Sequence, residues 1–413
     1  MPADIATTRP GVGTGPRRVL VVLCTTEIIS WGVLYYAFPV LLPTIGSRTG
    51  WSLAAITAGF SASQVVAGLV GIPVGRVLDR HGPRAIMTTG SVLAVLALLA
   101  LARATSLMWF TAAWLLAGVA MAGVFYAPAF AALTRWYGPR RVSALTALTL
   151  VAGLASTVFA PLTAVLNDRL DWRGTYLVLA GFVAVTTIPL HLLGLRLPWP
   201  AVEHETAHAP AAVARSRPFL VLVVAMSLAA FSVYAVVVNL VPLLAERGMT
   251  TSAAAVALGL GGVGQVLGRL GYARLAARTS VRFRTLVVLL VGAAVTTALG
   301  VVPGPASLLV AGSVLAGVTR GIFTLVQATA ITDRWGATHY GRLNGLLTAP
   351  VMLTAAIAPW AGSALAERLG GYPAVFVVLG AIGVLAAALS TVGVPDLHGL
   401  SRSGTRQPGP GHT

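Results

Sequence analysis

Long runs of apolar residues alternate with short polar turns along almost the whole chain. A helix needs about 20 predominantly apolar residues to cross the hydrocarbon core of a bilayer. Segments of about ten residues with alternating polarity, typical of outer-membrane barrels, are not found in the sequence. The pattern therefore predicts an all-α membrane protein with twelve transmembrane helices. The twelve runs lie at about residues 19–42, 52–74, 85–102, 107–133, 143–166, 174–195, 219–244, 252–273, 285–302, 306–331, 343–365 and 373–394.

The run of apolar helices is interrupted by one long polar segment. Residues 197–217 are rich in Pro, Ala and His, and they are too polar to form a span. This linker separates a bundle at 19–196 from a bundle at 218–395, with polar tails at 1–18 and 396–413. Six spans on each side predict two pseudo-symmetric six-helix bundles, an arrangement in which transporters bind substrate between the halves near mid-membrane.

Composition supports the same class of protein. Hydrophobic residues make up 57% of the chain and charged residues 9%, and the mean hydropathy is +0.86. Soluble domains carry about 25% charged residues. A lipid bilayer is therefore the first partner that the sequence requires.

The charged residues also predict an orientation. The net charge is +17, and all 28 basic residues are arginine. If the N-terminus is cytoplasmic, 20 arginines lie on the cytoplasmic side, six lie outside and two lie within spans. The positive-inside rule then places both termini and the linker in the cytoplasm of a cell that carries this protein in its inner or plasma membrane. The excess charge needs no nucleic-acid partner.

Two short motifs match functional signatures without their structural context. His204–His208 reads H-E-x-x-H, but it lies in the proline-rich linker rather than on a stable helix. Gly259–Gly264 reads G-x-G-x-x-G, but it lies inside an apolar run, where small residues let membrane helices pack closely. We expect no metal, no cofactor and no enzymatic activity.

A charged decapeptide, Gly75–Arg84, lies between the second and third runs. Its pattern G-x-x-x-D-R-x-G-x-R resembles the loop between helices 2 and 3 of major facilitator superfamily transporters, and a degraded copy follows at Ala273–Arg278. The resemblance implies a gating segment that holds the outward-open state. In it Asp79 accepts hydrogen bonds at a helix N-terminus and two arginines hold helix ends, while two glycines permit the turn. These four residues are Arg80, Arg84, Gly75 and Gly82.

Three full charges lie well inside predicted spans, where charges are expensive and usually functional. Glu27 and Arg269 lie about 12 Å from the cytoplasmic ends of their helices and Arg320 about 16 Å, at ~1.5 Å per residue. Glu27 can form a structural ion pair with only one of the arginines. The remaining positive charge favours an anionic substrate, with Glu27 as either a pairing partner or a proton carrier.

Polar and aromatic neighbours extend this candidate site at helical spacing. Trp31 and Tyr35 follow Glu27 at positions i+4 and i+8, on one face of the first helix. Gln265 lies one turn before Arg269, and Gln327 lies two turns after Arg320. Such a lining suits a small organic anion, although an aromatic stripe is more often packing.

Further motifs resemble the monocarboxylate and oxalate/formate porter branch of the superfamily. They are Thr49–Ser52, Arg135–Arg141 and Asp171–Gly174. The resemblance implies that Arg269, four residues before the loop repeat, contacts the substrate carboxylate. The chain departs from the branch at Gln265, where an Asp is usual, and it lacks the branch's lysines in helices 1 and 11.

We therefore expect a monomeric secondary active transporter that moves a small organic anion by alternating access, with proton coupling left open. A proton-coupled drug antiporter is the main alternative, but Trp114 stands where that branch carries a helix-4 arginine before Gly118. A membrane sensor that does not transport would need a signalling domain, and tails of about 18 residues offer none.

Overall fold

The computed structural model describes residues 14–199, 211–335 and 340–392, and within these ranges it contains helices and no strand. The all-α membrane fold expected from the apolar runs is confirmed. The first half consists of α1 (Thr14–Trp31), the π-helical turn η1 (Gly32–Tyr36), α2 (Ala37–Thr49), α3 (Leu53–His81), α4 (Pro83–Ala102), α5 (Leu107–Val124), α6 (Tyr126–Tyr137), the 3-10 turn η2 (Gly138–Arg140), α7 (Arg141–Ala152) and α8 (Ala155–Gly194). The second half consists of α9 (Ala211–Ala214), α10 (Arg217–Glu246), α11 (Thr251–Arg278), α12 (Val281–Val301), α13 (Ala306–Thr329), α14 (Thr332–Trp335), α15 (Tyr340–Leu369) and α16 (Tyr372–Val392).

Helix α8 contains two spans that meet at a sharp turn. Among the described residues, 11 helical segments are long and apolar enough to cross a membrane, and one of them, Ser143–Gly194, is 52 residues long. Asp171 interrupts this segment with φ 66° and ψ 178°, a conformation that is costly for a residue other than glycine. Its Oδ1 accepts a hydrogen bond of 2.8 Å from the Gly174 N–H, which caps the helix that follows. The turn divides the segment and brings the number of spans to twelve.

Capping side chains determine where several spans begin. A helix leaves its first N–H groups without partners, and such groups are costly in an apolar environment. Serine and threonine side chains accept a hydrogen bond from the backbone N–H three residues later at five helix starts. These caps are Ser52 of α3, Ser106 of α5, Ser216 of α10, Thr250 of α11 and Ser280 of α12.

The turn between α3 and α4 carries the charged decapeptide. Gly82 ends α3 with φ 78°, which glycine adopts without steric cost, and Pro83 begins α4. The sequence placed Gly75 in the same turn, and that placement is wrong. Gly75 lies inside α3, where the backbone is regularly helical.

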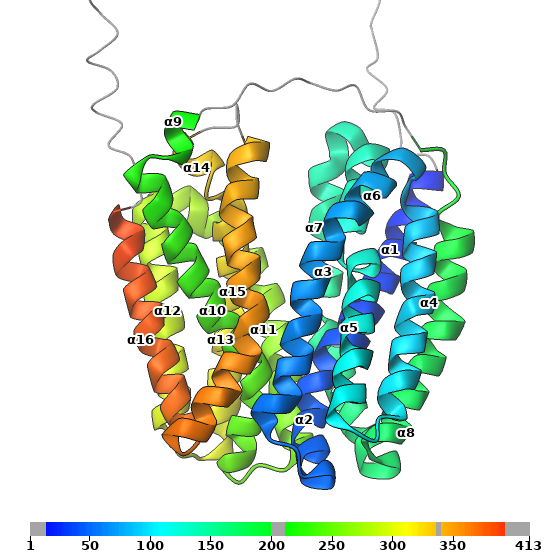
Figure 1. Cartoon of the computed structure of the whole chain (residues 1–413). Coiled ribbons are helices and arrows are strands. Elements are labelled where there is room, and N and C mark those ends of the chain that lie inside the picture. The colour runs from blue at the N-terminus through cyan, green and yellow to red at the C-terminus, as the bar shows by residue number, and fades with distance from the viewer. Residues whose placement is uncertain (1–13, 200–210, 336–339, 393–413) are drawn as a thin grey trace, which may run out of the picture.

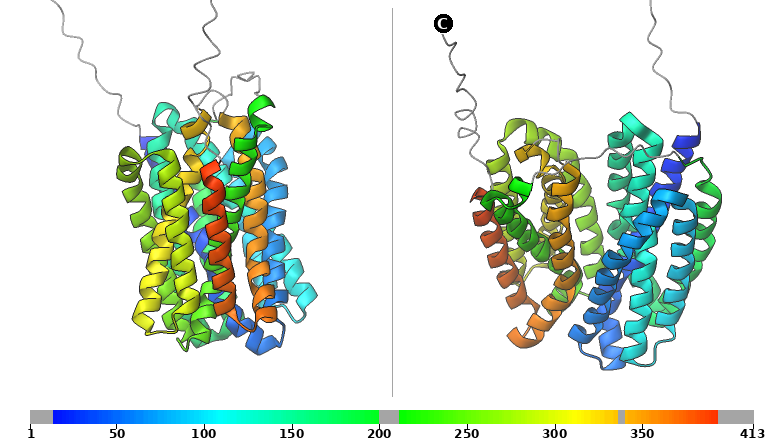
Figure 2. Two further views of the ribbon diagram at one scale, coloured as in Figure 1. Left: turned by 90° about the vertical axis from the view of Figure 1, so that its left-hand side faces the viewer. Right: turned by 45° about the horizontal axis from the view of Figure 1, so that its top comes forward.

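The two halves form separate bundles that stand side by side (Figures 1 and 2). Helices α1–α8 form one bundle and α10–α16 form the other. The start of α1, the short α9 and the end of α16 lie at the same end of the molecule, at the top of Figure 1. We call this end the terminus face. The end at which α2 finishes and α3 begins is the opposite face.

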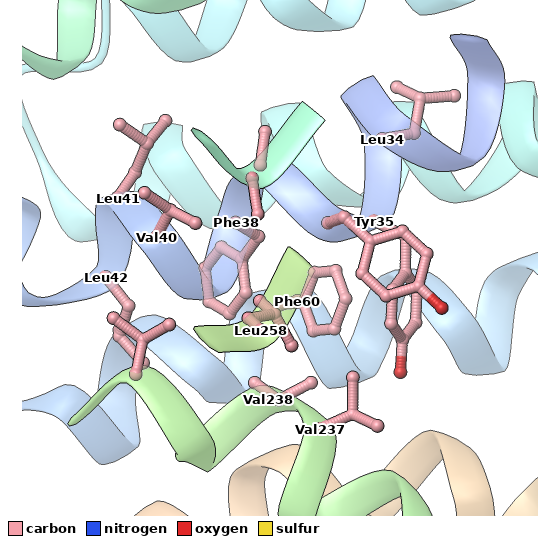
Figure 3. Close-up of a cluster of buried hydrophobic side chains, with 14 of the residues drawn as sticks. Leu34, Tyr35, Phe38, Val40, Leu41, Leu42, Phe60, Val237, Val238 and Leu258 are labelled. Carbon is pink, nitrogen blue, oxygen red and sulfur yellow. The ribbon is translucent and has the colours of Figure 1, made fainter. Parts of the chain in front are cut away.

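The apolar core shows where the bundles are joined. One large cluster of buried side chains contains residues of both halves, and it lies toward the opposite face. Figure 3 shows its centre, where Phe38 and Phe60 face Val237, Val238 and Leu258 of the second half. The two aromatic rings are stacked with centroids 4.2 Å apart. Toward the terminus face, by contrast, each half has a cluster of its own.

Polar contacts between the halves follow the same distribution. Near the opposite face, Glu367 Oε1 accepts a hydrogen bond of 2.9 Å from the Ala54 N–H. Ser252 Oγ donates to Asp168 Oδ2 at 2.7 Å. Two further hydrogen bonds lie deeper in the interface, from Thr157 Oγ1 to the Gly259 carbonyl and from the Trp360 N–H to Ser61 Oγ. The described structure is therefore one in which the halves are held together at the opposite face.

We expect Glu367→Ala to loosen this face. The change removes an acceptor at the start of α3, and a net hydrogen bond contributes ~1 kcal/mol, about a fivefold change in the ratio of closed to open molecules. Spin labels at Arg48 and Leu369, introduced after Cys24→Ser, would report a larger fraction of long distances by pulsed electron paramagnetic resonance. The neighbouring change Arg368→Ala is the control. Equal distance distributions in the two variants would contradict the assigned role.

Candidate functional site

A cavity of about 60 Å³ lies between the two halves, in the middle of the molecule. A cavity needs only about 10–15 Å³ to hold one water, so this space admits a small solute. The first half contributes Trp31, Tyr35, Tyr36, Tyr126, Ala152 and Gly153. The second half contributes Tyr234, Val237, Gln265, Arg269, Arg320 and Thr324. The structure thus brings together five of the seven residues that the sequence singled out for substrate binding.

Arg320 is the deepest cation of this central cavity. Its side chain is only 8% exposed, and one Nη donates a hydrogen bond of 2.7 Å to Gln265 Oε1. The guanidinium carbon lies 5.9 Å from the centre of the Tyr36 ring, within range of a cation–π interaction. Its Nε has no hydrogen-bond partner in the part of the chain that the structure describes. Gln265 satisfies a donor but brings no negative charge.

The position of Arg320 follows from close packing of α11 against α13. A Cβ added to Gly321 would lie 2.1 Å from the Gln265 carbonyl oxygen, and one added to Gly317 would lie 1.9 Å from the Gly261 carbonyl oxygen. Only glycine permits helices to approach this closely. The interpretation of Gly259–Gly264 as a packing motif is confirmed. The same contact places the side chains of Gln265 and Arg320 beside each other.

Arg269 reaches from α11 to the first half. One Nη donates a hydrogen bond to the carbonyl oxygen of Thr149 on α7. Gly153 lies against the guanidinium, because a Cβ there would be 3.2 Å from the same nitrogen. Arg269 therefore connects the bundles through the break between α7 and α8. Among the residues that the structure describes, neither Arg269 nor Arg320 has a carboxylate within salt-bridge distance.

Glu27 lies behind the aromatic wall of the cavity. It is fully buried, and its Oε2 accepts a hydrogen bond of 3.0 Å from Trp31 Nε1. Oε1 has no hydrogen-bond partner within residues 14–199, 211–335 and 340–392. The Trp31 ring is stacked on Phe125 at 4.1 Å between centroids, with an interplanar angle of 8°. The sequence left open an ion pair between Glu27 and an arginine, and no such pair is formed among the described residues.

Gln327 is the other predicted residue that does not line the cavity. It is half-buried on α13, and Thr324, one turn earlier, faces the space instead. Thr324 Oγ1 donates to the carbonyl oxygens of Arg320 and Gly321, so its hydroxyl proton is not available to a solute in the cavity.

Sequence reasoning missed three tyrosines of the cavity. Tyr36 follows Tyr35 directly, and on a regular helix the two would point about 100° apart. The π-helical turn η1 shifts the register so that both rings face the space. Tyr126 begins α6 after a break at Phe125, which has extended φ and ψ angles. The apolar pattern signals neither irregularity. The third, Tyr234, lies in an apolar run without any distinguishing motif.

The gating residues lie at the terminus face of the first half. Arg84 Nε donates a hydrogen bond of 2.8 Å to the Leu192 carbonyl near the end of α8, so it holds a helix end within its own half. Arg80 is exposed, and the side chain of Asp79 lies outside the described residues. The H-E-x-x-H segment, His204–His208, also lies outside them. Within the described ranges, no group of three or more His, Cys, Asp or Glu could hold a metal.

The fold and the cavity define a membrane transporter built from two six-helix bundles. The family model described as Major Facilitator Superfamily matches residues 23–305 and 222–409, and the chain belongs to this family. Monocarboxylate transporter 13 of Rattus norvegicus is 30% identical over 329 residues, covering 77% of this chain and 68% of that protein. Monocarboxylate transporter 11 of Homo sapiens is 27% identical over 354 residues, covering 82% of this chain and 74% of that protein. These relatives support the assignment of this chain to the monocarboxylate branch of the superfamily.

Solved structures show the same fold. A bacterial homologue of the human lysosomal transporter Spinster, inward-facing and unoccupied, superimposes with a TM-score of 0.74 at 15% identity, covering 93% of this chain and 98% of that chain. The nucleoside transporter NupG superimposes with a TM-score of 0.65 at 12% identity, covering 91% of this chain and 98% of that chain.

The glycine contact between α11 and α13 can be tested directly. Gly321→Ala would place a methyl group against the Gln265 backbone, and overpacking of this kind costs about 1–3 kcal/mol. We expect a lower midpoint of thermal unfolding in detergent and weaker substrate binding. Gly271→Ala on α11, where a Cβ meets nothing within 4 Å, is the matched control. If both variants unfold at the wild-type temperature, close helix contact does not position Arg320.

Proposed function

We propose that this transporter moves a small organic monocarboxylate by alternating access, with the carboxylate bound between Arg269 and Arg320. The observation that carries the proposal is that two guanidinium groups line one central cavity and that neither forms a salt bridge with a carboxylate of the described residues. A guanidinium recognises a carboxylate through two parallel hydrogen bonds. Monocarboxylate transporters among the relatives support the same substrate class.

The orientation proposed for the protein is a cytoplasmic terminus face in the plasma or inner membrane. The arginine-rich loops and the described ends of the linker, residues 197–199 and 211–217, belong to this face (Figure 1), in agreement with the positive-inside rule. The described state, joined at the opposite face, would then be open toward the cytoplasm. The similarity to an inward-facing structure supports this assignment.

Alternating access requires the contacts between the halves to change with occupancy. The bond from Arg269 to the Thr149 carbonyl links substrate recognition to the position of the other half. A bound carboxylate competes for the same guanidinium donors, and its arrival therefore weakens one link between the bundles. Rocking of the bundles around the cavity would then break the contacts at the opposite face.

Glu27 is the proposed proton carrier. A buried, ionised carboxylate without a cation is costly, and the single hydrogen bond from Trp31 compensates only part of that cost. Protonation would therefore accompany the state described here. Because Trp31 lines the cavity, a change of charge on Glu27 would alter the orientation of a residue that faces the substrate.

A proton-coupled drug antiporter is the second candidate. Trp31 and four tyrosines line the cavity, and aromatic faces attract lipophilic cations. Two arginines in the same space oppose a cationic substrate. Uptake into liposomes of labelled acetate and labelled hexanoate, compared with efflux of a lipophilic cation, distinguishes the two functions.

Arg320→Lys and Arg269→Lys should each raise the KM for a transported monocarboxylate about tenfold. Lysine keeps the charge but loses the planar pair of donors, and one charge-assisted hydrogen bond contributes about 1.5–3 kcal/mol. Initial rates in proteoliposomes measure the effect. Arg274→Lys, an exposed change on the same helix as Arg269, serves as control. Unaltered KM values in both cavity variants would refute the proposed site.

Glu27→Gln should abolish accumulation driven by a pH gradient while exchange of labelled for unlabelled substrate continues. Glutamine keeps an acceptor for Trp31 Nε1 but cannot take up a proton. The measurement compares net uptake with exchange in the same vesicles. Net uptake that still follows the pH gradient would show that Glu27 carries no proton. A loss of folded protein would instead assign it a structural role.

A further inference from the structure

The second bundle contains a cavity of its own, of about 50 Å³. Helices α10, α11, α12, α13 and α16 surround it, and every residue that lines it is buried or half-buried. Bundle interiors are close-packed, and voids much larger than a water are few. We call this space the tail cavity.

The tail cavity is apolar despite several hydroxyl groups in its wall. Ser232 Oγ donates to the Leu379 carbonyl and Ser313 Oγ to the Leu309 carbonyl. Thr319 Oγ1 donates to the Ala316 carbonyl. These hydroxyl groups already use their proton within the bundle. Glycines and alanines rather than larger residues create the space, and the remaining wall is mostly valine and leucine.

One charged residue reaches this apolar space, and it belongs to the central cavity as well. Arg320 and Val237 line both cavities. One Nη of Arg320 donates a hydrogen bond to Gln265, and Nε has no partner among the described residues. A molecule whose carboxylate binds Arg320 would therefore have an apolar space directly beside its charged end.

We propose that the tail cavity takes the aliphatic tail of the transported monocarboxylate, so that the protein selects carboxylates with longer hydrocarbon chains. The assignment rests on the function proposed above, because the carboxylate must lie at Arg320. Each methylene group that leaves water for the cavity should tighten binding about fourfold. Acetate, which has a single methyl group, cannot fill the space.

The test compares acetate with hexanoate in proteoliposomes that contain the full chain. For the wild type, we expect kcat/KM for hexanoate to exceed that for acetate by at least tenfold. Gly292→Leu would fill the cavity from α12, where the nearest side-chain atoms to an added Cβ lie 3.8 Å away on Thr319. This change should reduce the hexanoate-to-acetate ratio at least tenfold. Ala316→Leu fills the cavity from α13 and should act in the same way, even if one variant folds poorly.

Gly181→Leu is the matched control. Gly181 is an exposed residue of α8, and a Cβ there meets nothing within 4 Å, so the ratio should stay at the wild-type value. Equal hexanoate-to-acetate ratios in the wild type and in both filled variants would overturn the proposal. This result is expected if the tail cavity holds a lipid chain or is empty. If the wild type neither binds nor transports either carboxylate, the proposed function itself fails. If both are transported without preference for the longer chain, only the tail cavity loses its assignment.

Discussion

The close contact of α11 with α13 is the constraint on which the site depends. Glycines on both helices bring each backbone against the other, and no larger side chain fits at Gly317 or Gly321. The contact fixes Gln265 and Arg320 side by side at mid-membrane. It also sets the distance from these helices to α10 and α12, which leaves a space inside the second bundle. The proposed binding sites for the carboxylate and for the hydrocarbon tail therefore depend on the same helix contact.

Arg269 and Arg320 each donate a hydrogen bond that does not neutralise the positive charge. An amide oxygen and a backbone carbonyl accept their hydrogen bonds, and neither is an anion. Isolated buried charges carry an effective penalty of several kcal/mol each. The central cavity is therefore a region of positive potential that a carboxylate would relieve. The neutral carboxylic acid proposed at Glu27 would preserve this potential, whereas an ionised Glu27 would reduce it.

The sequence predicted the fold, and it singled out Arg269 and Arg320, which line the central cavity, because both results depend on regular helices. Apolar runs of membrane length locate the spans, and helical spacing correctly places Trp31 one turn from Glu27. The sequence did not predict that Glu27 bonds to Trp31 rather than to an arginine, because helix spacing gives no distance between helices. Tyr36 and Tyr126 were missed because a π-helical turn and a helix break determine where they point. Such irregularities arise from tertiary packing and leave no periodic signal.

The hydrogen bonds that cross between the halves mostly join a side chain to a main-chain group. Among the described residues, four have this form: Ala54 with Glu367, Thr149 with Arg269, Thr157 with Gly259, and Ser61 with Trp360. A main-chain partner is present whatever residue occupies its position. The two halves can therefore diverge in evolution without matched substitutions at these contacts. Among homologous sequences, covariation between the halves should concentrate at side-chain pairs such as Asp168 and Ser252.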